Sequence, residues 1–181
     1  MTSIIKKNSF ILVNFDSNNA PSVKIYGALS RIDNRLKIKY VLNNSSAIAI
    51  PQTNKAPLRR YDLWEHTCFE FFLRIKNTTK YWEFNLSPSR NWNVFRFLNY
   101  RSNIVEEKAF DALPFTVLQD AESLILKAKI NLNKIVAADE NLEVAIATVV
   151  ESRDKELSYW ALTHPATEAD FHHQDSFSIE I

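Results

Sequence analysis

Three neighbouring segments between residues 63 and 101 alternate between two sets of side chains, and both sets include aromatic residues. In residues 68–74, every second position holds a large apolar side chain, namely Phe69, Phe71 and Leu73, and residues 81–86 repeat the pattern. A period of two is typical of β-strands, and the short polar break at 76–80 predicts a hairpin. Residues 92–98 alternate in the same way. We therefore expect the chain to be organised around an antiparallel sheet.

The alternation gives these strands a core face and a second face that carries polar side chains. Glu70 lies on the second face of one strand, and Glu83 and Asn85 lie on the second face of the next. Side chains on the same face of paired strands are neighbours. We therefore expect the two carboxyl groups and the amide to meet across the hairpin.

The rest of the chain is a series of short apolar runs separated by polar turns. Between residues 43 and 60 we expect a long loop of the kind that often carries binding groups. Short helices are expected at 105–113 and 131–138, and strands at 10–15, 22–32, 36–42, 115–118, 124–132, 141–150, 156–162 and 177–181. About ten short strands with at most one or two short helices predict an all-β fold, an antiparallel β-sandwich or jelly roll.

Length and composition limit the organisation of the chain. With 181 residues, of which 46% are hydrophobic and 12% aromatic, we expect a single domain over residues 1–181. The net charge is +1, from 22 basic and 21 acidic residues. Such a balance gives no overall field that attracts nucleic acid or an anionic membrane. We therefore expect neither partner, and the sequence leaves the oligomeric state open.

Glycine and cysteine each occur once, as Gly27 and Cys68. Turns with positive φ must therefore use Asn or Asp, and neither a phosphate-cradling loop nor a dinucleotide fingerprint can be built. One cysteine excludes an intrachain disulfide and a zinc site of several thiolates, which fits a reducing compartment. The N-terminal residues lack the pattern of a signal peptide, and no run approaches the ~20 apolar residues of a membrane span. These features predict a cytoplasmic protein.

Aromatic and polar residues in the central segments suggest a carbohydrate site. The apolar face of a sugar ring stacks on an indole, while carboxylates, amides and arginines bind its hydroxyls. The residues of suitable type are Trp64, Glu70, Glu83, Asn85, Trp92 and Arg96. The structural alternative is that Trp82 and Trp92 fill the core and that Glu83 pairs with Arg96 or Arg101.

Two further chemistries use residues of the same chain. Glu70 and Glu83 are a carboxyl pair of the kind that hydrolyses glycosides when it flanks a cleft. A group near the C-terminus has the residue types of a metal site, namely His164, Asp170, His172 and His173. Surface or loop-capping roles are commoner for such histidines, and His66 is interpreted as a structural hydrogen-bonding residue beside Trp64.

Three motifs in the same order resemble the bacterial DOMON-like family, which is similar to the family-nine carbohydrate-binding modules. They are Leu-Trp-Glu-His-Thr-Cys-Phe-Glu at 63–70, Tyr-Trp-Glu-Phe-Asn-Leu-Ser-Pro-Ser at 81–89, and Tyr-Trp-Ala-Leu-Thr-His-Pro at 159–165 followed by Asp-Phe-His at 170–172. The segment from Trp92 to Arg101 also resembles the family. Three positions depart from its pattern and bear on loop conformation, namely Arg90, Thr167 and Ala169.

The resemblance implies a β-sandwich that binds a sugar or haem. For a sugar it implies two clamping tryptophans, Trp64 and either Trp92 or Trp160. For haem, a methionine–histidine pair would need an internal methionine, and Met1 is the only one. Ligation by two histidines would draw on His66, His164, His172 and His173. The resemblance also implies structural calcium, for which Glu70 or Asp170 are candidates, although no calcium-loop spacing is present.

The sequence therefore predicts a non-catalytic β-sandwich that binds a small polar ligand, a sugar in the leading hypothesis. The alternatives are a hydrolase that uses Glu70 and Glu83, a protein-interaction module with an aromatic surface, and a haem-binding domain with two histidine ligands. The predicted ligand-binding residues are Trp64, Glu70, Glu83, Asn85, Trp92, Arg96, Arg101, Trp160 and His164.

Overall fold

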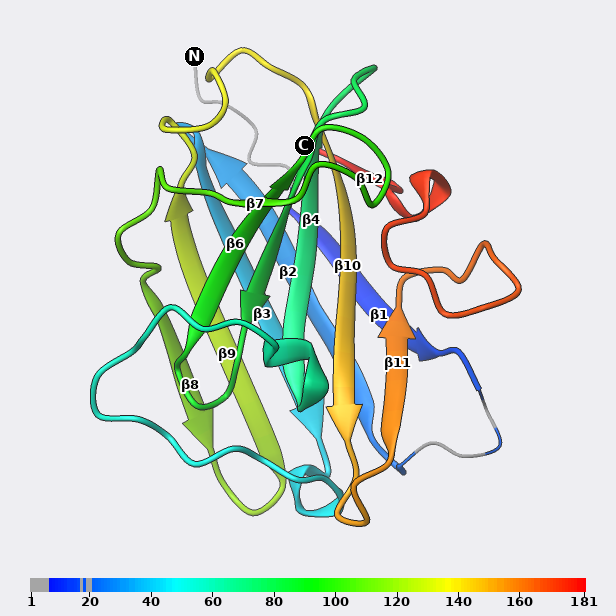
Figure 1. Cartoon of the computed structure of the whole chain (residues 1–181). Coiled ribbons are helices and arrows are strands. Elements are labelled where there is room, and N and C mark those ends of the chain that lie inside the picture. The colour runs from blue at the N-terminus through cyan, green and yellow to red at the C-terminus, as the bar shows by residue number, and fades with distance from the viewer. Residues whose placement is uncertain (1–6, 17, 19–20) are drawn as a thin grey trace.

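The computed structural model describes residues 7–16, 18 and 21–181, which form two antiparallel sheets packed face to face (Figure 1). The first sheet has the order β1 (Asn8–Asn14), β2 (Lys24–Ile32), β3 (Arg35–Asn43), β9 (Ser123–Asn131) and β8 (Phe115–Gln119). The second has the order β7 (Val105–Glu106), β6 (Trp92–Phe97), β5 (Tyr81–Leu86), β4 (Cys68–Ile75), β10 (Leu142–Glu151) and β11 (Leu157–Ala161), and β12 (Ile179–Glu180) pairs with β10. We call them the β2 sheet and the β4 sheet.

Strand β1 joins the two sheets at one edge. It pairs with β2 along most of its length, while Val13 and Asn14 pair with β11 of the other sheet. The twelve strands among the described residues therefore form one curled sheet that folds onto itself. The predicted all-β antiparallel sandwich is confirmed, and β7 is the strand that the expected ranges did not include.

The main core lies between the sheets and follows the alternation seen in the sequence. Phe71 of β4 and Phe84 of β5 stack at a ring distance of 4.4 Å inside it. Trp82 and Trp92 are both buried in the same cluster. The predicted core faces of residues 68–74, 81–86 and 92–97 are thus confirmed, because the opposite set of side chains packs on the outer face of the β4 sheet.

The two predicted short helices are wrong. Residues 105–113 begin with β7, where Val105 pairs with Arg96 and the Glu107 amide donates to the Val94 carbonyl. Residues 131–138 form turns, because β9 continues to Asn131 and the Leu132 amide donates to the Asn34 carbonyl of the β2–β3 hairpin. Side chains of the same hairpin bind two carbonyls of these turns. Asn34 donates to the Val136 carbonyl at 2.9 Å and Arg31 donates to that of Ala137 at 2.9 Å. The helices among the described residues are three-residue 3₁₀ turns, namely η1 (Ser45–Ala47), η2 (Leu63–Glu65) and η3 (Gln174–Ser176).

Asn and Asp carry most of the tight turns, as the scarcity of glycine predicts. Positive φ values occur at Asp33, Asn34, Asn44, Asp62, Asn77 and Asn103, and also at Arg90, Arg101 and Lys155. Asp120 acts differently, because its carboxylate accepts hydrogen bonds from the Glu122 and Ser123 amides. In the 152–155 turn, Lys155 has the positive φ in place of Asp154.

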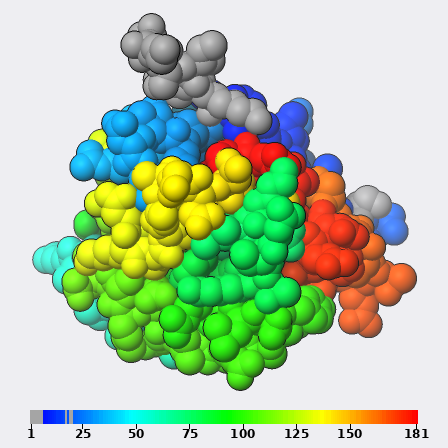
Figure 2. Space-filling model, turned by 90° about the horizontal axis from the view of Figure 1, so that it is seen from above, coloured from blue at the N-terminus to red at the C-terminus, as the bar shows by residue number. Residues whose placement is uncertain are grey.

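At one end of the sandwich, three turns that are far apart in the sequence lie together. Figure 2 shows the yellow 132–140 segment between the blue β2–β3 turn and the green β4–β5 turn. Leu132 donates to the Asn34 carbonyl at 2.9 Å, and Lys76 donates to that of Asn141 at 2.9 Å. Among the residues that the structure describes, no helix has the length and apolar character to cross a membrane.

Gly27 marks a position where two strands approach too closely for any side chain. A Cβ there would lie 1.9 Å from the Lys39 carbonyl oxygen and 2.5 Å from the Phe10 ring. We expect Gly27→Ala to lower the free energy of unfolding by about 3 kcal/mol or more, since both neighbours are fixed by the sheet and the core. Urea unfolding measures this loss. The neighbouring Ala28→Ser should stay within about 1 kcal/mol of the wild type, and equal stability of all three proteins would contradict the close approach.

Candidate functional site

The outer face of the β4 sheet carries the polar side chains that the central hairpin predicted. Glu70 of β4 lies between Asn85 of β5 and Ala147 of β10 in the strand register. Ala145 and Ala147 are the outward side chains of the middle of β10, and both are buried. Small residues beside Glu70 leave a hollow over the centre of the sheet.

The segment that carries Trp64 covers one side of this hollow. Asp62 has a positive φ of 58° and begins η2, which places the Trp64 ring 5.9 Å from the Phe95 ring of β6. His66 Nδ1 lies 2.8 Å from the Glu151 carboxylate of β10, which anchors the segment after η2. The structural interpretation of His66 as a hydrogen-bonding residue beside Trp64 is therefore confirmed.

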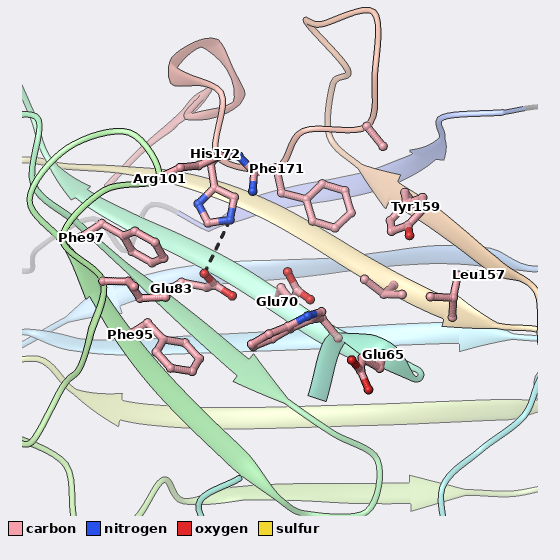
Figure 3. Close-up of a pocket in the computed structure, with 14 residues that line it drawn as sticks. Glu65, Glu70, Glu83, Phe95, Phe97, Arg101, Leu157, Tyr159, Phe171 and His172 are labelled. Atoms are coloured by element: carbon pink, nitrogen blue, oxygen red, sulfur yellow. Dashed lines mark ion pairs between the residues drawn. The ribbon is translucent and has the colours of Figure 1, made fainter. Parts of the chain in front are cut away.

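A pocket of about 570 Å³ occupies the hollow, within the range of small-molecule sites. Figure 3 shows the Glu70 and Glu83 carboxyl groups in its middle, with Phe95 and Phe97 to one side and Phe171 and Tyr159 to the other. Its lining residues come from five strands and three loops, and they are Trp64, Glu65, Glu70, Glu83, Phe95, Phe97, Arg101, Ile104, Val149, Leu157, Tyr159, Ala169, Phe171 and His172.

The floor of the pocket contains two buried carboxyl groups. Glu70 is 3% exposed and Glu83 is 6% exposed. Asn85 is fully buried and donates to Glu83 Oε1 at 2.7 Å, and its own oxygen lies 3.7 Å from the Cys68 thiol. The Oε1 atom of Glu70 is buried and has no hydrogen-bond partner among the described residues. The floor therefore holds one supported carboxyl group and one with an unsatisfied oxygen.

His172 closes the pocket above Glu83. Its Nδ1 lies 2.8 Å from the Tyr81 hydroxyl, which also accepts a hydrogen bond of 3.2 Å from the Arg101 amide. With the hydroxyl donating to Nδ1, the neutral ring carries its proton on Nε2. That nitrogen lies 3.7 Å from Glu83 Oε2 (Figure 3). The hydrogen-bond partner of Glu83 is Asn85, and neither Arg96 nor Arg101, the arginines considered from the sequence, forms an ion pair with it among the described residues.

Asp170 ties together the two loops that border the pocket. Its carboxylate accepts hydrogen bonds from the Arg101 guanidinium at 2.8 Å and from the Tyr100 hydroxyl at 2.6 Å. It also accepts one from the His172 amide at 3.1 Å. The charge of Arg101 is therefore balanced outside the floor.

Burial controls the protonation of the site. It raises the pKa of Glu83 to about 7, against smaller opposite effects of Asn85 and Arg101. Burial, with repulsion from Glu83, holds the pKa of Glu70 well above its ordinary value. Burial, followed by the nearby Arg101 charge, lowers the pKa of His172 to about 4. These pKa shifts favour the protonated forms of the two carboxyl groups and the neutral form of His172.

The structure brings five of the predicted ligand-binding residues together. Trp64, Glu70, Glu83 and Arg101 line the pocket, and Asn85 lies beneath it as the hydrogen-bond partner of Glu83. The expected meeting of the two carboxyl groups and the amide across the hairpin is thus what the strand register produces. No ligand is present, so their binding roles stay predictions.

The other four predicted residues lie away from the pocket. Trp92 and Trp160 are buried in the main core, and the Trp160 indole donates to the Ser158 hydroxyl at 3.0 Å. Arg96 shares a side of β6 with Trp92, opposite to Phe95 and Phe97. His164 lies at the edge of the sandwich, 2.9 Å from the Val13 carbonyl oxygen. Strand alternation explains the positions of Trp92, Arg96 and Trp160. The neighbours of each in its strand face the pocket side of the β4 sheet, so these three side chains face the other side.

Several aromatic residues of the pocket were not among the predicted ligand contacts. Phe95 and Phe97 flank the predicted residue Arg96, and Tyr159 precedes the predicted residue Trp160. The period of two in these strands therefore indicated that they lie on the opposite face. Phe171 and His172 come from a loop about 90 residues beyond β5. Only the resemblance motif pointed to Phe171, and His172 was otherwise considered only as a metal or haem ligand. The 43–60 loop contributes no residue to this pocket.

The histidines considered as haem or metal ligands take part in hydrogen bonds within the protein. The imidazoles of His66, His164, His172 and His173 each have a hydrogen-bond partner. Among the described residues, no group of three or more His, Cys, Asp or Glu side chains is arranged to hold a metal ion. The metal site considered at the C-terminal histidines and Asp170 therefore gains no support from their arrangement, and haem and calcium binding stay predictions.

Comparison with known proteins finds likeness in structure only. No family model and no curated protein matches the sequence. A candidate carbohydrate-binding protein from Bacteroides uniformis has a TM-score of 0.68 at 12% identity, covering 96% of this chain and 84% of that one. A family-nine carbohydrate-binding module from Caldicellulosiruptor kristjanssonii, solved with glucose, has a TM-score of 0.50 at 13% identity, covering 90% and 76%.

The same module has also been solved with cellotriose, with a TM-score of 0.50 at 13% identity and coverage of 90% and 75%. Such low identities establish the fold and leave the ligand open. The chain therefore has a fold like that of the family-nine modules.

Replacing Glu83 should change how stability depends on pH. Its pKa is about 7 in the folded protein against an ordinary value of 4.5, so between these values the folded state binds more protons and loses stability as the pH rises. Glu83→Gln removes this loss. The free energy of unfolding of the variant relative to the wild type should rise by about 2–3 kcal/mol from pH 5 to pH 8, as measured by urea unfolding.

Glu168→Gln provides the control, because Glu168 is an exposed carboxylate in the loop beside the pocket. Its stability should follow the wild-type pH curve. A Glu83→Gln curve parallel to the wild type would contradict the protonation of Glu83 on folding.

Proposed function

We propose that this chain is a non-catalytic carbohydrate-binding domain whose ligand occupies the pocket on the outer face of the β4 sheet. The observation that carries the proposal is the pocket itself, in which aromatic rings stand on both sides of a buried polar floor. Sugars combine an apolar ring face with many hydroxyls, so such a pocket complements both parts. The sugar complexes of structurally similar family-nine modules support the same class of ligand.

In this proposal Trp64 provides the stacking surface. Its indole is partly exposed and lies edge-on against Phe95, which fixes its orientation over the pocket. Phe171 packs against Tyr159 with ring centres 6.1 Å apart and provides the opposite wall. A sugar ring between the two walls would bury its apolar face without any movement of the sheet.

The polar floor would bind the hydroxyls of the ligand. Glu70 offers an oxygen that has no partner, whereas Glu83 is already held by Asn85. Asn85 is fully buried, so its contribution is to position Glu83 rather than to touch the ligand. Arg101 would act at the rim, since its guanidinium is bound to Asp170.

We also propose a relationship to the DOMON-like family. The three motifs that carry the resemblance contain Trp64 and Glu70, then Glu83 and Asn85, and finally Asp170 with Phe171 and His172. All of them meet at this pocket or support it.

The competing hydrolase hypothesis needs two carboxyl groups in different protonation states. In glycosidases one group is an acid and the other is an ionised base or nucleophile, so their environments separate their pKa values. Here burial raises the pKa of both Glu70 and Glu83. The hydrolase hypothesis therefore stays an alternative, because the two groups are shifted to different degrees, and it is tested by an assay for release of shorter sugars from cellotriose.

Replacing the stacking residue tests the proposal. We expect the wild type to bind glucose or cellotriose in isothermal titration calorimetry, with quenching of tryptophan fluorescence. Trp64→Ala should weaken binding by about tenfold or more, because the ring stacking and its buried area are lost.

Tyr26→Ala is the matched control, since Tyr26 is a partly exposed aromatic residue in the β2 sheet, far from the pocket. It should bind as the wild type does. Unchanged binding by Trp64→Ala would remove the proposed site, and release of shorter sugars from cellotriose by the purified protein would contradict the non-catalytic role.

A further inference from the structure

We propose that the pocket selects an amino sugar, and that the ammonium group of this ligand lies between Glu70 and Glu83. This inference rests on the proposed carbohydrate binding and narrows it to one chemical class. It comes from three features of the floor and walls: an unsatisfied buried acceptor, an uncompensated pair of acids, and a surround of aromatic rings.

The first feature is the unsatisfied oxygen of Glu70. Oε1 is buried beneath the pocket and accepts no hydrogen bond from the described residues. A buried acceptor without a donor is unfavourable, so native structures normally supply a partner from the protein, water or a ligand. Since Glu70 lines the pocket, the missing donor can come from a bound molecule.

The second feature is the lack of a positive charge against the two acids. Arg101 is the one basic side chain other than His172 among the described residues that line the pocket, and it is 50% exposed and bound to Asp170. His172 lies 3.7 Å from Glu83 and is neutral because burial lowers its pKa to about 4. Acidic side chains with no cation among them favour a cationic ligand.

Hydrogen-bonding capacity points to the same class of ligand. A carboxylate only accepts hydrogen bonds, whereas an ammonium group has three donors and no acceptor. Asn85 is fully buried and donates one N–H to Glu83, and His172 Nε2 lies 3.7 Å from the same carboxyl group. With both carboxyl groups ionised, the floor has more acceptors than donors, which complements an ammonium better than a hydroxyl that also seeks a donor.

The third feature is the aromatic surround. Rings of Trp64, Phe95, Phe97, Tyr159 and Phe171 line the pocket around the two acids (Figure 3). The face of an aromatic ring attracts a cation, and the attraction grows when water is excluded. The walls that would stack on a sugar therefore also favour a positive charge near the floor.

The protonation of the empty site agrees with this geometry. Burial raises the pKa of both acids, so the charged form of each carboxyl group is unfavourable without a partner. An ammonium bound between them would favour their charged forms. The two carboxyl groups, whose ionisation is unfavourable in the protein alone, would thus bind the ammonium group in the complex.

The test compares D-glucosamine, N-acetyl-D-glucosamine and D-glucose by calorimetry at pH 7 and low salt, with ethanolamine as a small ammonium probe. N-acetylation keeps the sugar ring and removes the charge. We expect D-glucosamine to bind at least about tenfold more tightly than either neutral sugar. Glu70→Gln should abolish this preference, whereas Glu168→Gln, which removes an exposed carboxylate outside the pocket, should keep it.

The outcomes separate the two proposals. Equal or tighter binding of the neutral sugars overturns the ammonium selectivity and leaves carbohydrate binding in place. Binding of ethanolamine as tight as that of D-glucosamine, with no binding of D-glucose, overturns carbohydrate binding and leaves a cation site. Failure of all four probes overturns both, and the probe series gives its answer on the wild type even if a variant does not fold.

Discussion

The pairing of β4 between β5 and β10 is the constraint on which both the core and the site depend. One face of β4 places Phe71 in the core, stacked on Phe84. The same register sets Glu70 on the opposite face between Asn85 and Ala147. A shift of one residue would exchange the two faces and bury the polar side chains in the core. The position of the floor is therefore as firmly determined as the packing of the sandwich.

The loops that cover the outer face turn a sheet surface into an open pocket. Asp170 binds Arg101, Tyr100 and the His172 amide, so the loop after β6 and the loop after β11 are held together. The ion pair with Asp170 holds the Arg101 charge at the rim, and its effect on the pKa of Glu83 is smaller than that of burial. The carboxyl groups remain buried with a single neutral histidine above them, a costly arrangement that the packing around the sheet must offset.

Local pattern was enough to predict the strands and their faces, because a period of two is visible within a few residues. It failed where partners are distant. The 131–138 segment forms turns instead of a helix, and it contacts Asn34 and Arg31 of the distant β2–β3 hairpin, which no local signal shows. Within the site, Glu70, Glu83 and Asn85 followed from alternation, whereas Phe171 and His172 arrive from the far end of the chain. Residue type alone favoured Trp160 as a ligand contact. Adjacent residues of a strand face opposite sides, so Trp160 faces the core and Tyr159 faces the pocket.

The two parts of the pocket are built by different elements, and this separates the ligand's shape from its charge. Loops and edge strands supply the aromatic walls, which suit any flat apolar face. Two inner strands supply Glu70 and Glu83, which decide what charge the floor accepts. Because core side chains occupy the alternate positions of those strands, residues 70 and 83 can differ between proteins of this fold without disturbing the sandwich. A likeness of fold at 12–13% identity is thus compatible with a different class of ligand, and the proposed preference for an ammonium group depends on these two positions.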